Sequence, residues 1–202
     1  MNAPAPTSTS YDLHFVLDGQ RFYWRNPNVG VTLTDAGRSS CLAWQSEGRD
    51  ESRLWTDIVS VVLSSATAGK AAINLCRIAF RDGRTITLTD AGADGLVDED
   101  RTPRYRDFVR ALHARLSAAP EGTIAFKAGF SEGRYKAVQV FFAIAALFFV
   151  GTPFVLLFIV RDWRVLGVLF AGAIFVWPLW KVVEHNRPRN YDPRHPPGEL
   201  ME

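Results

Sequence analysis

The sequence predicts an α+β membrane protein: an N-terminal seven-stranded β sandwich or barrel, one capping helix, and a two-helix transmembrane hairpin. Short extended runs fill residues 11–90, an amphipathic stretch follows, and residues 138–180 are almost entirely apolar. Residues 161–164 supply the only charges of that apolar stretch. We expect a disordered lead at 1–10, a cytoplasmic β domain at 11–130 with its capping helix near 103–118, a transmembrane hairpin at 135–184 and a Pro-rich cytoplasmic tail at 185–202.

Alternating or apolar runs separated by turn residues predict the seven strands. Asp-Gly stands between extended runs in "LDGQ" and "FRDGR", where glycine tolerates the positive φ of a tight hairpin. A further strand is expected in "TIAFKAGF". The seven predicted strands are "YDLHFVL", "QRFYWR", "VGVTLT", "SCLAW", "RLWTDIVSVVLSS", "AINLCRIAF" and "RTITLT".

One amphipathic helix follows these strands. Thr102 is expected at the N-cap with Pro103 at the first helical position. Apolar residues recur at helical spacing and form a single stripe that needs a partner surface. We therefore expect the helix to close the open end of the sandwich or barrel. The stripe consists of Tyr105, Phe108, Leu112 and Leu116.

Length and composition predict two membrane crossings. A hydrocarbon core of roughly 30 Å needs about 20 apolar residues. Residues 137–160 meet this length, and residues 165–183 approach it with Lys181 as the one interruption. Within these segments, Pro153 predicts a kink, and Gly167 and Ala171 form a small-residue pair suited to close helix packing.

Basic residues in the flanks of the hairpin set the expected orientation. More Lys and Arg lie before and after the hairpin than in its turn, which places both termini in the cytoplasm. Arginine outnumbers lysine, as in GC-rich bacterial genomes, so the expected site is a bacterial inner membrane. The lipid bilayer is therefore one expected partner. The net charge of +2 is too small to indicate a nucleic-acid-binding surface, so no nucleic-acid partner is expected.

The strand runs "LWTDIVSVVLSS" and "RIAFRDGRTITLT", followed by the helix "RYRDFVRALHARLS", resemble the membrane-anchored bacterial members of the pleckstrin-homology-like superfamily. This resemblance implies a PH-like fold for residues 11–119. It also implies a binding or scaffolding module, because that fold presents loops or a groove to lipids or peptides. The first hairpin, "VLDGQRFYWR", carries only Arg21 and Arg25 where the lipid-binding members have a dense basic motif.

Four residues are candidate interaction residues. Arg101 and Arg104 belong to a basic cluster that either touches anionic headgroups or forms a solvated helix face paired with aspartates. Tyr191 and Leu200 are the sizeable apolar groups of the tail, which is either a solvated end or a docking segment. Cys41 and Cys76 read as buried free thiols, and no residue pattern predicts a cofactor or metal site.

The leading functional hypothesis is a membrane-tethered, non-catalytic interaction, scaffold or assembly module facing the cytoplasm, with a protein partner or a second copy as its target. The alternative is an accessory subunit of a larger membrane complex whose hairpin is the functional part. A hydrolase is the third choice, because "GFSEG" at residues 129–133 matches a nucleophile elbow. The following helix is apolar and the chain lacks the large parallel sheet of such enzymes, which argues against this third choice.

Overall fold

The computed structural model describes residues 7–17, 28–36, 40–46, 48–68, 71–96, 98–120, 122–160 and 165–200. The chain divides into two compact units. Met1–Ala128 and Arg189–Glu202 form the first, here called the sheet unit, and Gly129–Pro188 form the second, the helical unit. The chain leaves the sheet unit after strand β8 (Ala125–Ala128) and returns to it as strand β9 (Arg189–Asn190). The helical unit is therefore an insertion within the sheet unit.

The described strands of the sheet unit form one nine-stranded sheet of order β4-β3-β2-β1-β7-β6-β5-β8-β9. The sheet is mixed, because β8 runs parallel to β5 while the other neighbours are antiparallel. Besides β8 and β9, its strands are β1 (Thr7–Leu17), β2 (Val29–Asp35), β3 (Cys41–Ser46), β4 (Arg49–Leu54), β5 (Ile58–Ala68), β6 (Ala71–Phe80) and β7 (Thr85–Thr89).

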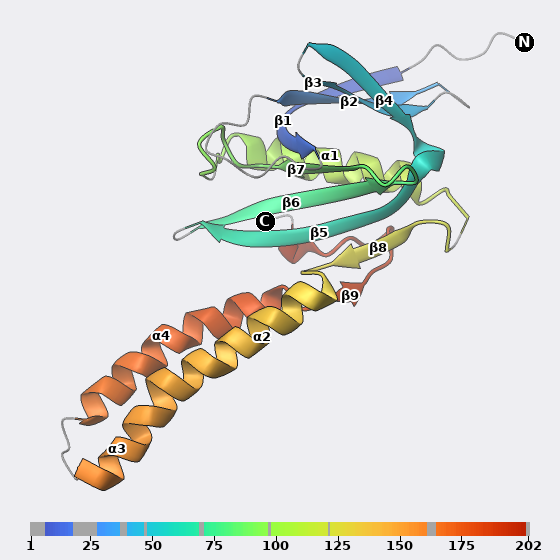
Figure 1. The fold of residues 1–202 in the computed structure, drawn as a ribbon. Coiled ribbons are helices and arrows are strands. Elements are labelled where there is room, and N and C mark those ends of the chain that lie inside the picture. The colour runs from blue at the N-terminus through green and yellow to red at the C-terminus, as the bar shows by residue number, and fades with distance from the viewer. Residues whose placement is uncertain are drawn as a thin grey trace, which may run out of the picture. The chain divides into compact units, whose positions relative to one another are not determined.

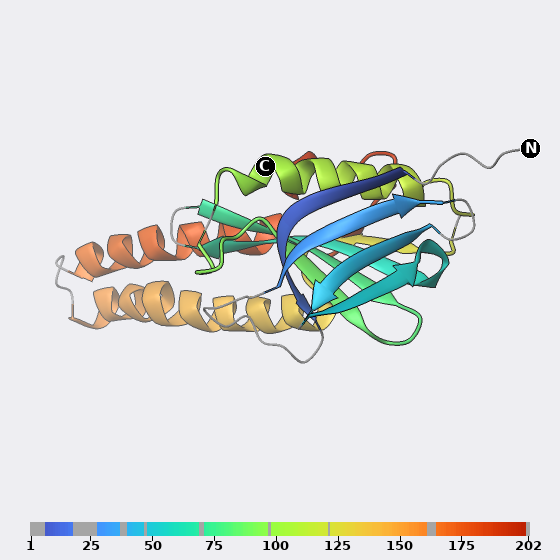
Figure 2. The same ribbon diagram turned by 90° about the horizontal axis from the view of Figure 1, so that it is seen from above.

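Strand β1 joins the two halves of the sheet. Its first half pairs with β2, from Thr7 opposite Asp35 to Tyr11 opposite Val31. Its second half pairs with β7, where His14 lies opposite Thr89 and Leu17 opposite Ile86. The register shifts between Tyr11 and His14, and such irregularities bend a strand and increase its twist. The sheet therefore folds over a core at β1 (Figures 1 and 2).

The predicted seven-stranded sandwich or barrel is wrong, because the described strands form one nine-stranded mixed sheet. The run "RLWTDIVSVVLSS" is not one strand, because a 3₁₀ turn at Trp55–Asp57 separates β4 from β5. The sequence did not predict β4, because this edge strand, "RDESRL", is mostly charged and lacks apolar alternation. Strands β8 and β9 then extend the sheet beyond β5. The predicted strand "QRFYWR" and residues 18–20 of the turn "LDGQ" lie outside the described residues.

Helix α1 (Arg101–Leu116) packs against the inner face of the bent sheet (Figures 1 and 2). Each residue of the predicted apolar stripe is at most 2% exposed. The N-cap position is Asp100, not Thr102. The Thr102 hydroxyl instead lies 3.4 Å from Asp90 Oδ2, while Asn74 donates its backbone N–H and its side-chain amide to the Asp90 carboxylate, each at 2.8 Å. This buried polar network ties the start of α1 to β6.

The helical unit contains α2 (Glu132–Ala146), a π-helical turn η3 (Leu147–Gly151), α3 (Thr152–Val160) and α4 (Val165–His185). The π turn ends two residues before Pro153, which has no N–H to donate to the Phe149 carbonyl. Gly172 of α4 lies against that carbonyl, and a Cβ at this position would clash with Phe149 O. The missing glycine side chain allows a close approach between η3 and α4.

The predicted two-helix transmembrane hairpin is also wrong. Among the described residues, only the continuous helix Glu132–Ile159 is long and apolar enough to cross a membrane. In α4, Lys181 ends the uninterrupted apolar run that begins at Val165, so this run is shorter than the roughly 20 residues of a typical span. The predicted turn at residues 161–164 lies outside the part of the chain that the structure describes.

Candidate functional site

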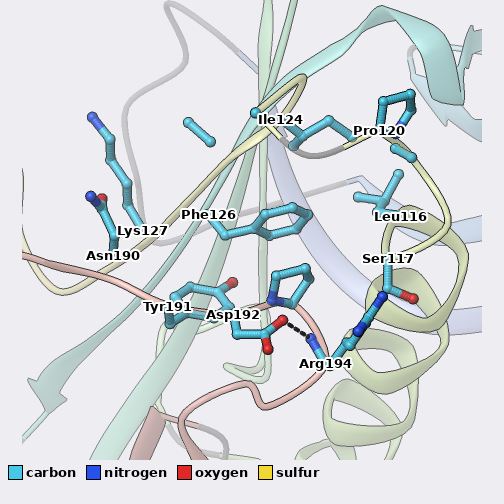
Figure 3. Close-up of a pocket in the computed structure, with 14 residues that line it drawn as sticks. Leu116, Ser117, Pro120, Ile124, Phe126, Lys127, Asn190, Tyr191, Asp192 and Arg194 are labelled. Carbon is cyan, nitrogen blue, oxygen red and sulfur yellow. Dashed lines mark hydrogen bonds between the residues drawn. The ribbon is translucent and has the colours of Figure 1, made fainter.

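A pocket of about 510 Å³ lies within the sheet unit, where three separate segments meet. The end of α1 and the loop after it form one side, β8 forms another, and Asn190 of β9 with residues 191–194 forms the third (Figure 3). Its volume falls in the range of about 300–1,000 Å³ that is usual for ligand sites. The C-terminal segment thus supplies one wall of the pocket.

Backbone pairing holds that wall in place. Lys127 lies opposite Asn190 and Ala128 opposite Arg189 in the antiparallel β8–β9 pair. The Tyr191 N–H continues the pairing and donates to the Phe126 carbonyl at 3.2 Å. Continuing this register would place Pro193 opposite Ile124, and proline has no N–H to donate. The β8–β9 ladder therefore stops at the pocket.

Two side chains fasten the tail to α1 and to the core. The Tyr191 hydroxyl lies 2.7 Å from Nε2 of His113, and Leu200, in the 3₁₀ turn η4 (Gly198–Leu200), is 0% exposed. Arg189 and Glu199 form an ion pair at 3.1 Å across the same segment. Residues 189–200 are therefore a packed part of the sheet unit and not a solvated end.

The hydrogen bonds of His113 determine its tautomer. Nδ1 lies 2.7 Å from the Val109 carbonyl oxygen, which only accepts, so Nδ1 carries the proton. Nε2 of the neutral ring then accepts from the Tyr191 hydroxyl. Burial lowers the pKa of His113, which keeps the neutral form at physiological pH, and burial also raises the pKa of Tyr191. The two side chains therefore form a neutral hydrogen-bonded pair, which we call the His113–Tyr191 clasp.

Aromatic rings surround the clasp. The ring centroids of His113 and Phe126 lie 5.6 Å apart, and those of Phe126 and Tyr191 lie 5.9 Å apart. Both separations fall within the range of favourable aromatic pairs. Phe126 and Tyr191 also line the pocket, as does Ile124 (Figure 3). The pocket thus has an apolar floor that is continuous with the clasp.

Charged groups stand at the pocket rim. The Asp192 carboxylate accepts the Arg194 N–H at 2.9 Å and lies 3.4 Å from Nδ1 of His195, and the backbone hydrogen bond is the main cause of its lowered pKa. Among the described residues, Lys127 forms no ion pair or hydrogen bond through its side chain, and Arg194 forms no salt bridge. The rim therefore carries an excess of positive charge.

The structure brings the predicted interaction residues to different places. Arg101 pairs with Asp98 at 3.0 Å, and Arg104 pairs with Asp12 at 2.9 Å, so both belong to a local ion-pair network. Tyr191 lies at the pocket, and Leu200 lies in the core. In the helical unit, Gly167 has open space around it and Ala171 is exposed, whereas the close helix contact is at the neighbouring Gly172.

Sequence reasoning missed His113, Phe126, Lys127 and Arg194. His113 had a detectable signal, because it falls on the buried face of α1, four residues after Val109 and three before Leu116. A polar residue on an apolar stripe needs a buried partner. Its partner, Tyr191, is 78 residues away in sequence, and no local pattern joins the two.

Other candidate chemistry is weaker. Ser131 of the "GFSEG" string occupies the N-cap position of α2, and no hydrogen bond joins its side chain to a histidine among the described residues. No group of three His, Cys, Asp or Glu side chains within the described ranges is placed to hold a metal ion. Cys76 is buried, and burial raises the pKa of its thiol to about 12.

Comparison of the chain with protein-family models, with curated proteins and with solved structures finds no match.

Proposed function

We propose that this chain is a membrane-anchored, non-catalytic binding module. In this proposal the helix Glu132–Ile159 inserts into a lipid bilayer, and the sheet unit carries the recognition surface at the pocket. A protein partner or a second copy of the chain is the proposed target. The likeness to membrane-anchored PH-like proteins, which rests on strands followed by one helix, stays a prediction.

The observation that carries the proposal is the apolar surface of the helix Glu132–Ile159. Within its most apolar 18-residue stretch, only 11% is buried within the structure. Large side chains project outward along its length, and in water such a surface has no stabilising contact. The most exposed of them are Phe141 at 69%, Leu147 at 70%, Phe148 at 67%, Phe158 at 66% and Ile159 at 72%.

The fold of the sheet unit supports placing both ends of the chain on one side of the membrane. Strand β8 precedes the helical unit and β9 follows it, yet the two strands pair directly. A folded sheet lies on one side of a bilayer, so β8 and β9 lie on the same side of the membrane in this proposal. The Lys and Arg residues next to both passages favour the cytoplasmic side of a bacterial inner membrane.

Fractionation of cells that express the full chain tests the proposal. We expect the chain to sediment with membranes, to resist extraction by alkaline carbonate and to be released by detergent. Replacing Phe148 by Asp should release a large fraction, because this residue lies near the middle of the helix and a charged group at the bilayer centre costs roughly 2.5–3.5 kcal/mol on translocon-insertion scales.

Replacing the exposed residues Leu54 and Leu96 of the sheet unit by Asp is the matched control. This control chain should remain in the membrane fraction, because its helical unit is unchanged. Recovery of the wild-type chain in the soluble fraction, folded and without detergent, would contradict the proposal.

A further inference from the structure

We infer that the basic end of the helical unit binds the headgroup of an anionic phospholipid, through Arg134 of α2 and Arg187 after α4. The inference rests on the proposed function, because it needs the helix Glu132–Ile159 to lie in a bilayer, and it names the class of lipid that the anchor selects. It is carried by the packing at this end of the helical unit, by the exposed charge there and by the length of the helix.

The first step is the packing that joins the start of α2 to the end of α4. The Phe130 N–H, just before α2, donates to the Asn186 carbonyl at 2.9 Å. Gly129 lies so close to the carbonyl oxygens of Asn186 and Arg187 that a Cβ at position 129 would clash with both. Figure 1 shows the start of α2 beside the end of α4. Arg134 and Arg187 therefore belong to the same end of the helical unit, although most of that unit separates them in sequence.

The second step is that both arginines remain available to an anion. Among the described residues, Arg134 forms no salt bridge, and its guanidinium carbon lies 4.5 Å from the centroid of the Phe130 ring. Arg187 has only a long ion pair of 3.9 Å with Glu184, and its side chain is 69% exposed. The planar guanidinium group presents paired donors that match the oxygens of a phosphate. Each arginine can therefore contact a lipid phosphate without breaking a short ion pair.

The charge around the two arginines favours a headgroup with a net negative charge. Over residues 129–136 and 181–188, Lys and Arg outnumber Asp and Glu four to two. Glu132 lies in the first turn of α2, where the helix dipole favours a carboxylate, and Glu184 lies beside Arg187. Anionic lipids attract such basic clusters next to a membrane helix, whereas a zwitterionic headgroup carries a compensating cation. The four basic residues are Arg134, Lys136, Lys181 and Arg187.

The third step is the depth of this end in a bilayer. A helix of 28 residues is about 42 Å long at about 1.5 Å per residue, whereas the hydrocarbon core is about 30 Å thick and the bilayer with its headgroups about 40–45 Å. The first turn of the helix, which includes Arg134, therefore reaches the headgroup layer. The Trp180 ring lies 5.3 Å from the Phe142 ring, further along the helices, and tryptophan is typical of the boundary below the headgroups.

Competition between two phospholipids tests the inference on the full chain in mild detergent. Native mass spectrometry would count the lipids retained from an equimolar mixture of phosphatidylglycerol and phosphatidylcholine with identical acyl chains. We expect wild type to retain more phosphatidylglycerol, with about a fivefold preference for each arginine, since a basic residue near an anionic surface contributes about 1 kcal/mol. The double variant Arg134→Gln, Arg187→Gln should reduce the preference by at least about fivefold.

Two controls make the result specific to this end of the helical unit. The double variant Arg49→Gln, Arg110→Gln removes the same two charges from exposed positions of the sheet unit and should keep the wild-type preference. Arg110 resembles Arg187, because its side chain is 62% exposed and its ion pair with Asp107 is long, at 3.7 Å. Inorganic phosphate, added at the same concentration as the lipids, should not displace phosphatidylglycerol, because it lacks acyl chains that contact the apolar helix.

Equal retention of the two lipids by wild type would overturn the inference, and so would an unchanged preference in Arg134→Gln, Arg187→Gln. An equal loss in both double variants would also overturn it, because net charge and not this site would then select the lipid. Displacement by inorganic phosphate would overturn it in favour of a free anion. The carbonate extraction described above separates these outcomes from the proposed function. A chain that stays in the washed membrane but shows no lipid preference refutes this inference alone, whereas a folded chain in the soluble fraction refutes the proposed function.

Discussion

At the scale of single residues, the His113–Tyr191 clasp decides whether the pocket has its third wall. His113 is 2% exposed, and both of its ring nitrogens have partners. Removing one partner of a buried hydrogen bond leaves the other without compensation, which costs more than the bond itself contributes. The packing of the tail on α1 therefore depends strongly on the Tyr191 hydroxyl, although Tyr191 lies near the end of the sequence.

Tyr191→Phe should weaken the clasp and keep the ring contacts. The Nε2 atom of His113 would lose its donor, and a buried acceptor without a partner costs about 1–3 kcal/mol. Denaturant unfolding of the purified full chain would measure the loss. Tyr135→Phe is the matched control, because the described residues show no hydrogen bond from the Tyr135 hydroxyl. Equal stability of the two variants would contradict the proposed role of the clasp.

Protonation of His113 should destabilise the sheet unit. Burial lowers its pKa below the ordinary value of 6.5, so the unfolded chain binds a proton at a higher pH than the folded chain. Stability is therefore fully present above about pH 6.5 and falls as the pH decreases toward the lowered pKa, with a slope of at most about 1.4 kcal/mol per pH unit. Unfolding curves between about pH 7.5 and pH 5.5 would measure this dependence.

His113→Gln removes this titration, so its free energy of unfolding should vary less with pH than that of wild type. Burial also lowers the pKa of His14 and raises that of Asp90, and both groups are present in the two proteins. Their contributions cancel when the two pH dependences are subtracted. Identical slopes for wild type and variant would show that His113 is not the titrating group.

At the scale of elements, the helical unit shows how one glycine allows two helical segments to approach closely. Thr152 Oγ1 donates to the Leu147 carbonyl at 3.3 Å at the end of the π turn, and the buried Pro153 follows. Gly172 of α4 lies next to the Phe149 carbonyl of this turn, and a side chain at position 172 would clash with it. The contact therefore needs a glycine at position 172.

Gly172→Ala should separate η3 from α4, because the added Cβ would clash with backbone, which cannot rotate away as a side chain does. Gly167→Ala in the same helix meets open space and should be neutral or stabilise the helix by about 0.5–1 kcal/mol. Thermal unfolding in detergent, followed by circular dichroism, would compare the two variants. A smaller effect for Gly172→Ala than for Gly167→Ala would contradict the packing described above.

The sequence allowed prediction of elements whose signals are local. The stripe of α1 follows from helical spacing, and the β6–β7 turn follows from Asp82-Gly83, where Gly83 has φ +85°. Prediction failed where the signal is distant. Strand β9 has only two residues and is defined by its pairing with β8. The pocket is formed by segments that precede and follow the helical unit in the sequence. The charged strand β4 lacks the apolar alternation that single-sequence reasoning needs.

At the scale of the whole chain, the sheet unit is discontinuous in sequence. Its last core residue, Leu200, belongs to the same hydrophobic cluster as Val61 and Leu63 of β5 and Phe108 of α1. A fragment that ends after α1 would lack this residue, the β8–β9 pair and the Tyr191 clasp. Residues 11–120, which by length look sufficient for a domain, therefore lack part of their own core.

Leu200→Ala should destabilise the sheet unit by about 2–5 kcal/mol, since it removes a fully buried side chain and leaves a cavity. Leu96→Ala makes the same chemical change at a residue that is 58% exposed, and its effect should stay within about 0.5 kcal/mol. Chemical denaturation of the full chain would compare them. Equal effects would show that the tail does not contribute to the core.

The insertion of the helical unit between β8 and β9 has a consequence for biosynthesis. Translation delivers β1–β8 first, then the apolar helices, and only afterwards the segment that carries β9, Tyr191 and Leu200. While the ribosome is still making the helices, the nascent sheet has an open edge at β8 and a gap in its core, which are the features that attract chaperones and promote aggregation. Synthesis of the helices therefore comes before completion of the sheet, and a chain truncated within the helices would carry an unfinished domain that cellular proteases can recognise.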